Sequence, residues 1–297
     1  MRFTAWLVLA ATLLLWSGNW IVARAVRDDI SPGLATAGRL VIVLALLAPY
    51  AWRGLAVKLP AFSRGDWKVL WLLGLSGGGL HLALQWLGLH YTTATSATLY
   101  LSTAPIFILL LAAPLLHERI RARQWLGVAI SFAGVALIGM QGKLLDQPSF
   151  NFGDLCALAS MAMWGSYTVF LRMRRDALDT VEFLTLVCLL GLVFMTPWLV
   201  VELVLGAMFR LTPAGMAAMF YSAIGSLLLA YAGWSFVVKW MGAARAGATM
   251  HLMPAIAVGL AALFLGEYPS WYHFAGIALI LAGVTLSARA PSAASSP

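Results

Sequence analysis

The chain has 297 residues, of which 62% are hydrophobic and 10% are charged, and its mean hydropathy is +0.89. Soluble globular domains are about 25% charged, so this composition excludes a soluble domain and indicates an integral membrane protein. The formal net charge of +8 is explained by basic loops between membrane spans, since no long basic run stands on a module that could bind nucleic acid. Cys156 and Cys188 lie inside apolar runs without metal-ligand spacing, which argues against a disulfide framework.

Ten apolar runs are each long enough to cross the hydrocarbon layer of a bilayer, which takes about 20 helical residues. Their hydrophobicity is nearly continuous and does not alternate, so helices are predicted and a β-barrel is disfavoured. The predicted helices lie at residues 4–23, 32–51, 67–89, 95–116, 122–140, 153–171, 180–204, 213–238, 245–265 and 271–288.

The first apolar run could instead be a secretory signal peptide. Arg2 precedes it, and Ala23-Arg24-Ala25 resembles a cleavage site. We favour a membrane helix, because the run is longer than a typical signal core and because its sequence pattern recurs at residues 164–172, in the middle of the chain.

The chain repeats itself at an offset of 148 to 149 residues. Each half carries five predicted spans, so the first repeat covers residues 5–140 and the second covers residues 153–288. The polar, turn-rich segment 141–152 connects them, and the Ser/Ala/Pro-rich tail 289–297 is predicted to be disordered. Recurring positions include Trp16 and Trp164, Arg24 and Arg172, Pro49 and Pro197, and Pro105 and Pro254.

Basic residues fall mainly on one side of the predicted membrane. With a cytoplasmic amino terminus, 14 Lys and Arg residues lie at inner span ends and 4 at outer ones, so both termini are predicted to be cytoplasmic. Because each half has an odd number of spans, the second repeat runs opposite to the first. The repeats are therefore predicted to be inverted.

Short motifs at matching places of the two halves carry a family resemblance. They are Leu15-Trp16-Ser17-Gly18-Asn19-Trp20, Ser31-Pro32, Ala37-Gly38-Arg39-Leu40, Ala104-Pro105, His117-Glu118-Arg119 and Ala133-Gly134-Val135, with Met253-Pro254, Gly266-Glu267 and Ala282-Gly283-Val284 repeating the ending. Through these motifs the chain resembles the EamA branch of the drug/metabolite transporter superfamily over residues 5–288.

This resemblance implies an all-α integral membrane fold of ten helices in two inverted five-helix repeats. It also implies alternating-access movement of small metabolites, often amino-acid export, across a bacterial inner (plasma) membrane. The second half departs from the pattern, because Val187 stands where the first half has Arg39, and Gly165-Ser166 follows its tryptophan. We therefore expect the two halves to contact the substrate differently.

Aromatic and polar residues on the first helix of each half predict a substrate cavity. Trp16, Asn19 and Trp20 share one helix face, and Trp164 and Tyr167 hold matching places in the second half. Large rings at helix ends usually form an interfacial belt. These tryptophans lie well inside their segments, and Asn19 would be unpaired in lipid, so we favour a cavity wall.

Charged and titratable groups inside the other spans are further candidates. Arg39 lies about seven residues into its helix and must face protein or water; it either clamps structural groups or binds a substrate carboxylate. An intramembrane histidine is either a packing residue or a proton carrier. Proton coupling, if present, would have to use His81, His251 or Glu182. The remaining cavity candidates are His81, Gln85, Tyr231, Trp234 and His251.

Pro105 and Pro254 fall near the middle of predicted helices in both halves. An interior proline removes a backbone hydrogen bond and kinks the helix. Static curvature would explain one such residue, but repetition at the same depth favours a hinge beside the cavity, where Tyr100 could also reach.

The class of protein follows by comparison of alternatives. His117-Glu118 lacks the second histidine of a zinc protease and no Gly-x-Ser-x-Gly elbow occurs, so we expect no enzyme, catalytic residue, metal or cofactor. A channel is disfavoured by the paired prolines. An exporter of cationic or aromatic drugs is the closer alternative, since aromatic rings hold cations, although Arg39 would repel one.

We therefore predict a secondary transporter that exports small metabolites, above all amino acids or related compounds, by alternating access. Its expected partners are the small-molecule substrate and the lipid bilayer, and no nucleic acid. The sequence leaves the oligomeric state open, and a monomer is compatible with it.

Overall fold

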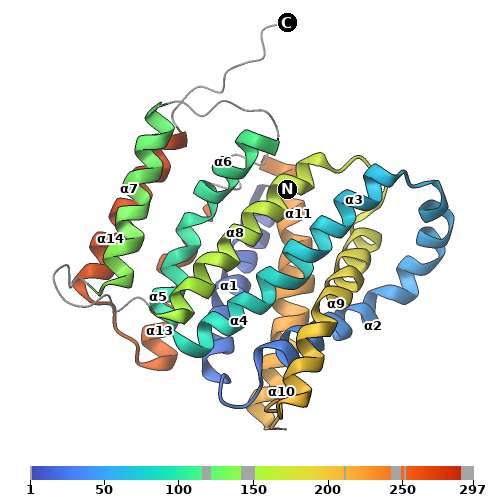
Figure 1. The fold of residues 1–297 in the computed structure, drawn as a ribbon, viewed down its shortest axis with the longest axis horizontal. Coiled ribbons are helices and arrows are strands. Elements are labelled where there is room, and N and C mark those ends of the chain that lie inside the picture. Colours follow the sequence, from blue (N-terminus) through green and yellow to red (C-terminus); the bar gives the residue numbers. More distant parts are fainter. Residues whose placement is uncertain are drawn as a thin grey trace, which may run out of the picture.

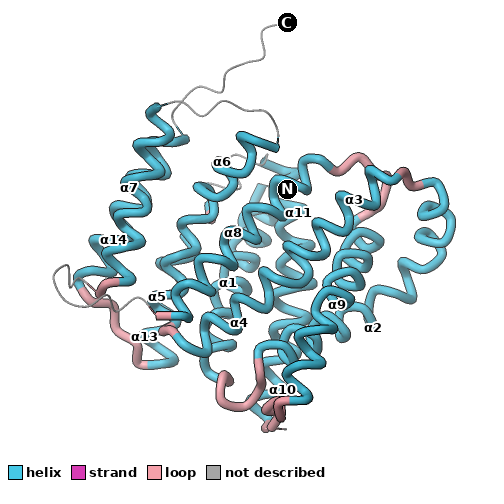
Figure 2. Tube along the Cα trace, viewed as in Figure 1, coloured by secondary structure: helices cyan, strands magenta, loops and turns pink. Residues whose placement is uncertain are grey.

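A computed structural model of the chain describes residues 2–115, 122–141, 151–210, 212–241, 249–250 and 252–288. Within these ranges the regular elements are helices, and an isolated antiparallel bridge joins Ile30 to Phe209. The helices form one bundle, with α7 and α14 together at one edge (Figure 1). The described loops lie at the two ends of the bundle (Figure 2).

In the first half, each predicted span appears as one helical run. The third run changes from α-helix to π-helix and back, and the fourth contains a 3₁₀ turn. The elements are α1 (Arg2–Ala25), α2 (Pro32–Lys58) with the 3₁₀ turn η1 (Leu59–Ala61), α3 (Arg64–Leu73), the π-helix η2 (Gly74–Leu80), α4 (His81–Tyr91), α5 (Ala94–Leu99), the 3₁₀ turn η3 (Tyr100–Thr103), α6 (Ala104–Leu115) and α7 (Ala122–Gly139).

The second half follows the same order, and its third run also changes from α-helix to π-helix and back. Its elements are α8 (Phe152–Met173), α9 (Thr180–Val204), α10 (Pro213–Phe220), the π-helix η4 (Tyr221–Leu229), α11 (Ala230–Met241), α13 (Leu252–Leu265) and α14 (Trp271–Ala288). The predicted helix 245–265 is described as a helix from Leu252 onward. The predicted connection 141–152 and tail 289–297 lie mostly outside the described residues.

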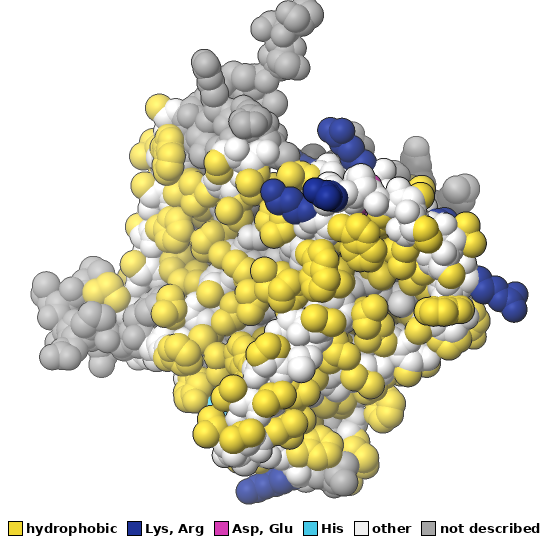
Figure 3. Space-filling model, turned by 45° about the vertical axis from the view of Figure 1, so that its right-hand side comes forward, with side chains coloured by type: hydrophobic (Ala, Val, Ile, Leu, Met, Phe, Trp, Pro, Cys, Tyr) yellow, Lys and Arg dark blue, Asp and Glu magenta, His cyan; other side chains and the backbone are white. Residues whose placement is uncertain are grey.

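The lengths and surface of the helices suit a bilayer. Seven runs in the described part are long and apolar enough to cross a membrane, and three more, at Ala122–Ile138, Ala255–Leu265 and Trp271–Leu286, are apolar but shorter. Hydrophobic side chains cover the face seen in Figure 3, where Lys and Arg gather mainly near the upper end. Trp52, near the end of α2, is 71% exposed, as suits a tryptophan at a membrane interface.

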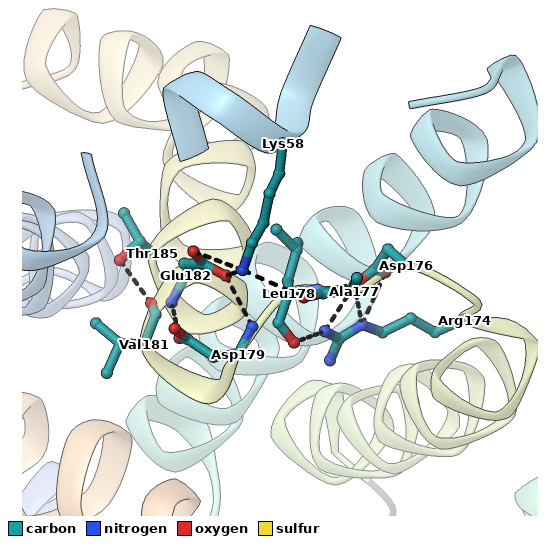
Figure 4. Close-up of polar contacts among 9 residues, drawn as sticks. All are labelled: Lys58, Arg174, Asp176, Ala177, Leu178, Asp179, Val181, Glu182 and Thr185. Atoms are coloured by element: carbon teal, nitrogen blue, oxygen red, sulfur yellow. Dashed lines mark hydrogen bonds and ion pairs between the residues drawn. The ribbon is translucent and has the colours of Figure 1, made fainter. Parts of the chain in front are cut away.

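Ionic hydrogen bonds fix the loop between α8 and α9 (Figure 4). Arg174 Nε donates to both carboxylate oxygens of Asp176, at 2.7 and 2.8 Å. Lys58, at the end of α2, donates to Glu182 in the first turn of α9 at 2.6 Å. Glu182 also accepts from the backbone N–H of Asp179 at 2.8 Å, which completes a capping box. The carboxyl end of α2 is thereby tied to the amino end of α9.

The opposite ends of these two helices are joined as well. Glu202, near the end of α9, accepts from Ser31 Oγ at 2.6 Å and from the backbone N–H of Gly33 at 2.9 Å. Trp198 Nε1 donates to the same carboxylate at 2.7 Å. A carboxylate is favourable at the positive amino end of a helix. The helices α2 and α9 therefore form an antiparallel pair held at both ends.

The helices α7 and α14 approach each other through glycines. A Cβ atom on Gly134 would meet the carbonyl oxygen of Gly276, and one on Gly283 would meet the carbonyl oxygen of Gly127. Between these contacts, Ser131 Oγ donates to the carbonyl oxygen of Ile280 at 3.1 Å. Small residues allow such close backbone approach between membrane helices. Contacts that come later along α7 come earlier along α14, so this pair is antiparallel too.

The other main contacts cross between the two halves. The helix α1 packs against α11 and α13 of the second half, and α8 packs in the same manner against α4 and α6 of the first. The π-helix η4 lies on α2, and η2 lies on α9. A Cβ atom on Gly78 would meet the carbonyl oxygen of Val187, so the glycines of η2 allow α9 to approach its backbone. π-helical segments frequently occur at functional sites.

Candidate functional site

A cavity between the two halves is the candidate substrate site. Its wall comes from α1, α4, α8 and α11 together with η3, η4 and the starts of α6 and α13. The residues that the sequence predicted and that line it are Trp16, Trp20, His81, Gln85, Trp164 and Tyr231.

Aromatic rings form the centre of the wall. The Trp16 ring on α1 contacts three rings of the second half, with centroid distances of 5.9 Å to Trp164, 5.8 Å to Tyr231 and 5.4 Å to Trp234. Trp164 also stacks on Tyr167 at 5.3 Å. Aromatic pairs of this geometry contribute about 0.5–1.5 kcal/mol each beyond their area burial. The two repeat-related tryptophans therefore meet in the middle of the molecule.

Backbone carbonyl groups hold two of the lining side chains. Trp16 Nε1 donates to the carbonyl oxygen of Ser226 in η4 at 3.1 Å. His81 Nδ1 lies 2.9 Å from the carbonyl oxygen of Ser160, and Ser160 Oγ donates back to the carbonyl oxygen of His81 at 3.0 Å. Ser160 Oγ lies 2.9 Å from the same nitrogen, so the roles depend on the tautomer; with a hydrogen on Nδ1, the ring donates to the Ser160 carbonyl oxygen. In neutral His81 the other ring nitrogen is then an acceptor.

A series of buried hydrogen bonds connects Arg39 to the cavity. Its Nη2 donates to the carbonyl oxygen of Leu82 at 2.8 Å, and its Nη1 donates to Ser222 Oγ at 3.2 Å. Ser222 Oγ donates to Asn19 Oδ1 at 2.7 Å, and Asn19 Nδ2 donates to Gln85 Oε1 at 3.3 Å. The Arg39 side chain is buried and does not line the cavity, whereas Gln85 does.

The cavity wall has few polar groups and no full charge from Asp, Glu, Lys or Arg among the lining residues. Arg39 lies over the Trp86 ring, 5.6 Å from its centroid, and no described carboxylate forms an ion pair with it. The described residues also contain no group of three or more His, Cys, Asp or Glu side chains that could hold a metal ion.

A second polar cluster lies at one end of the bundle, one helical turn beyond the cavity. Arg24 follows Trp20 by one turn of α1, and its Nη1 donates to the carbonyl oxygen of Leu89 at the end of α4, at 2.9 Å. Its Nε lies 3.5 Å from Glu267, between α13 and α14. Glu267 in turn accepts from the backbone N–H of Thr95 at the start of α5, at 3.0 Å. This cluster joins both halves at one end.

Other predicted residues lie behind the wall or outside the described part. Asn19, Arg39, Tyr100, Tyr167 and Trp234 are not lining residues, although each lies on an element that forms or supports the wall. His251 falls outside the described residues. Of the two predicted hinge residues, Pro105 is the second residue of α6, which begins directly after the 3₁₀ turn η3, and Pro254 lies in the first turn of α13.

Several lining residues were not predicted from the sequence. They are Leu82, Leu101, Ala104, Met161, Ser226, Met250 and Met253. The sequence could have identified three of them. Met161 lies one helical turn before Trp164, and Ala104 and Met253 each directly precede one of the paired prolines. Methionine adapts its shape and is common at surfaces that accept varied ligands.

Comparison with known proteins adds an independent line of information. The profile of the EamA-like transporter family matches residues 3–140 and again residues 151–289. An uncharacterized transporter of Archaeoglobus fulgidus is 29% identical and aligns over 95% of this chain and 96% of its own length. A probable terminal-alkyne amino-acid exporter of Streptantibioticus cattleyicolor is 27% identical over 95% of this chain and 92% of its own. A crystal structure at 23% identity has the same fold, with a TM-score of 0.61 and 97% of both chains covered.

Proposed function

This chain belongs to the EamA-like transporter family, and from that premise we propose that it exports amino acids or related small metabolites across a bacterial inner membrane by alternating access. As a member of this family it is a multi-pass membrane transporter and not an enzyme. The observation that carries the proposal is the aromatic cavity between the two halves, where Trp16 meets Trp164.

Alternating access needs two related halves, and the contacts support ten helices in two inverted repeats over residues 5–140 and 153–288. Position 127 faces position 283, and position 134 faces position 276. Adding 149 to 127 and to 134 gives 276 and 283, so the repeat turns each of these contacts into the other. In the α2–α9 pair, Glu202 accepts from the backbone N–H of Leu34, while a Cβ atom on Gly54 would meet Glu182. Adding 148 to 34 and to 54 gives 182 and 202, so here too the repeat turns each contact into the other. Such reciprocal contacts are typical of an approximate twofold axis.

We place the substrate among the aromatic and polar residues of the wall. Trp16, Trp20, Trp164 and Tyr231 provide apolar surface, while His81 and Gln85 supply hydrogen-bonding groups. Asn19, Arg39, Tyr100, Tyr167 and Trp234 support them from behind, and His251 is kept as a candidate. Pro105 and Pro254 are proposed as hinges, supported by the departure from α-helical geometry at η3, which ends two residues before Pro105.

Two features favour amino acids over cationic drugs as substrates. No lining residue is Asp or Glu, so nothing in the wall neutralises a drug cation, and the nearby Arg39 charge opposes one. A relative that aligns over most of the chain is named a probable amino-acid exporter.

Transport by purified protein in proteoliposomes tests this function. Vesicles loaded with unlabelled amino acids should show counterflow of radiolabelled amino acids with apolar side chains. Absence of counterflow for every amino acid, together with robust uptake of a quaternary ammonium cation, would establish the drug-export alternative. Measuring the flux with and without a pH gradient then decides whether protons are coupled to transport.

A further inference from the structure

We infer that the side-chain amide of Gln85 binds the carboxylate of the substrate, and that Arg39 is a positioning residue that orients this amide through Ser222 and Asn19. The inference rests on the proposed function, because it assigns roles inside the proposed substrate cavity. The four side chains come from three helical runs of the first half and one of the second, and together they form the donor relay described above.

The direction of the relay is set at its buried end. A guanidinium group has only donors, so Ser222 Oγ must accept from Arg39. The one hydrogen of the Ser222 hydroxyl is then free to go to Asn19, whose Oδ1 lies 2.7 Å away. If the Asn19 amide were turned over, Ser222 would face two donors and its own hydrogen would lose its acceptor. The network therefore fixes the orientation of the Asn19 amide.

The same reasoning extends to the cavity. With Oδ1 turned to Ser222, the Nδ2 group of Asn19 donates to Gln85 Oε1 at 3.3 Å. Gln85 Nε2 therefore points its hydrogens elsewhere, and no described residue accepts from it, while Gln85 itself lines the cavity. The hydrogens of Gln85 Nε2 are therefore donors that a ligand in the cavity can use. A group with several acceptor lone pairs, such as a carboxylate, is its natural partner.

Charge favours the same ligand group. The Arg39 side chain is 1% exposed and forms no ion pair with any carboxylate in the described part of the chain. An uncompensated buried charge is costly, and a substrate anion nearby would offset that cost. The aromatic and methionine side chains of the wall would hold an apolar remainder. The substrate class is therefore an amino acid with a large apolar side chain and a free α-carboxylate.

Matched ligands test the role of Gln85. Dissociation constants for purified protein in detergent are compared between leucine, phenylalanine and tryptophan and the amines that lack only their carboxylate: 3-methylbutylamine, 2-phenylethylamine and tryptamine. The wild-type protein should prefer each acid, and Gln85→Glu should reverse the preference, because it replaces donors by an anion. Wild-type protein that prefers the amines, or a Gln85→Glu variant that keeps the wild-type order, would overturn the inference.

Substitutions at two further positions test the relay. Ser222→Ala should weaken binding of the acids by about 2- to 10-fold, as expected for one hydrogen bond, and leave the amines unchanged. Arg39→Gln should reduce the preference for acids more than Arg39→Lys, which keeps the charge. Ser76→Ala is the matched control, since Ser76 is equally buried, lies in the other π-helix and bonds only its own helix through Leu72. Equal losses for acids and amines in Ser222→Ala would mean a purely structural role.

A measurement without ligand separates the two proposals. If no acid or amine binds wild-type protein, the proposed function fails, but the relay can still be examined by thermal unfolding of Asn19→Ala, Ser222→Ala and the double variant. A working relay predicts that the double variant loses clearly less stability than the sum of the single losses, because either substitution breaks it. Additive losses would overturn the relay.

Discussion

Trp164 has more ring contacts than any other side chain described around the cavity, since it meets Trp16, His81, Tyr167 and Tyr231. Replacing it by alanine removes these contacts together with apolar surface for the substrate. We expect Trp164→Ala to raise the KM for amino-acid counterflow by about tenfold or more, which corresponds to about 1.4 kcal/mol or more. Trp52→Ala is the control, because Trp52 is 71% exposed and does not line the cavity. An unchanged KM in both variants would remove Trp164 from the substrate site.

Glu202 is the residue on which the junction between α2 and α9 depends. Glu202→Gln keeps the shape but replaces one acceptor oxygen by a donor facing Gly33 N–H or Trp198 Nε1–H. We expect the free energy of unfolding to fall by about 1–3 kcal/mol, the range for a lost charge-assisted hydrogen bond. Thermal unfolding in detergent measures this. A variant as stable as wild type would show that the cap is dispensable.

The hydrogen-bond partners of Arg39 could not be predicted from the sequence. The depth of Arg39 in its span predicts that it needs a partner, but its partners Leu82 and Ser222 are 43 and 183 positions away in the chain. Which helices surround a residue depends on packing and leaves no local pattern. For the same reason the sequence placed Arg39 in the cavity wall. It did not reveal that Gln85 lines the cavity while Arg39 lies in the second layer, linked to Gln85 through Ser222 and Asn19.

At the scale of helices, the α7–α14 contact makes a sharp test of packing. Gly134→Ala adds a methyl group against the backbone of α14 and should lower the free energy of unfolding by about 1–3 kcal/mol. Gly259→Ala on α13 is the matched control, since a Cβ atom there meets nothing within 4 Å, and it should be neutral or stabilise by up to about 1 kcal/mol. Similar effects of both substitutions in thermal unfolding would contradict close packing at Gly134.

Within the described residues, helical runs lie at the predicted spans, and seven of these runs are long and apolar enough to cross a bilayer, because length and hydrophobicity determine what can cross. The π-helices η2 and η4 were not predicted. Their hydrogen-bonding register depends on how closely α9 and α2 approach the backbone, as the contact of Gly78 with α9 illustrates. The glycine run 77–79 predicted close packing but not its partner.

For the whole molecule, the inverted topology predicts that Gly65 and Met208 lie on opposite sides of the membrane. Gly65 is exposed in the first turn of α3, and Met208 is exposed in the loop between α9 and α10. Cys156 and Cys188 are buried, so background labelling should be small. In intact cells, a membrane-impermeant maleimide should label Met208→Cys and not Gly65→Cys. Labelling of Gly65→Cys alone would reverse the predicted orientation, and labelling of both would contradict the span count.

The Arg24 cluster predicts how one end of the cavity opens. Arg24→Gln weakens its links to Leu89 and Glu267, so the end that topology places outside should open more often. We expect faster labelling of a cysteine at the lining position Ala104 by an impermeant reagent added to cells. Arg210→Gln, at an exposed loop position, should leave the rate unchanged. An unchanged rate in Arg24→Gln would remove this cluster from the gating of the cavity.

The sequence by itself determined that the protein is helical and membrane-embedded, because bilayer thickness and the absence of water translate directly into runs of apolar residues. Its motifs also predicted the family, which the profile match confirms. Only the tertiary structure decided which predicted residues meet: the rings of Trp16 and Trp164, 148 positions apart, are in contact, while Arg39 is linked to Gln85 through Ser222 and Asn19. Such contacts depend on how helices from two halves pack against each other, and no local pattern encodes that packing.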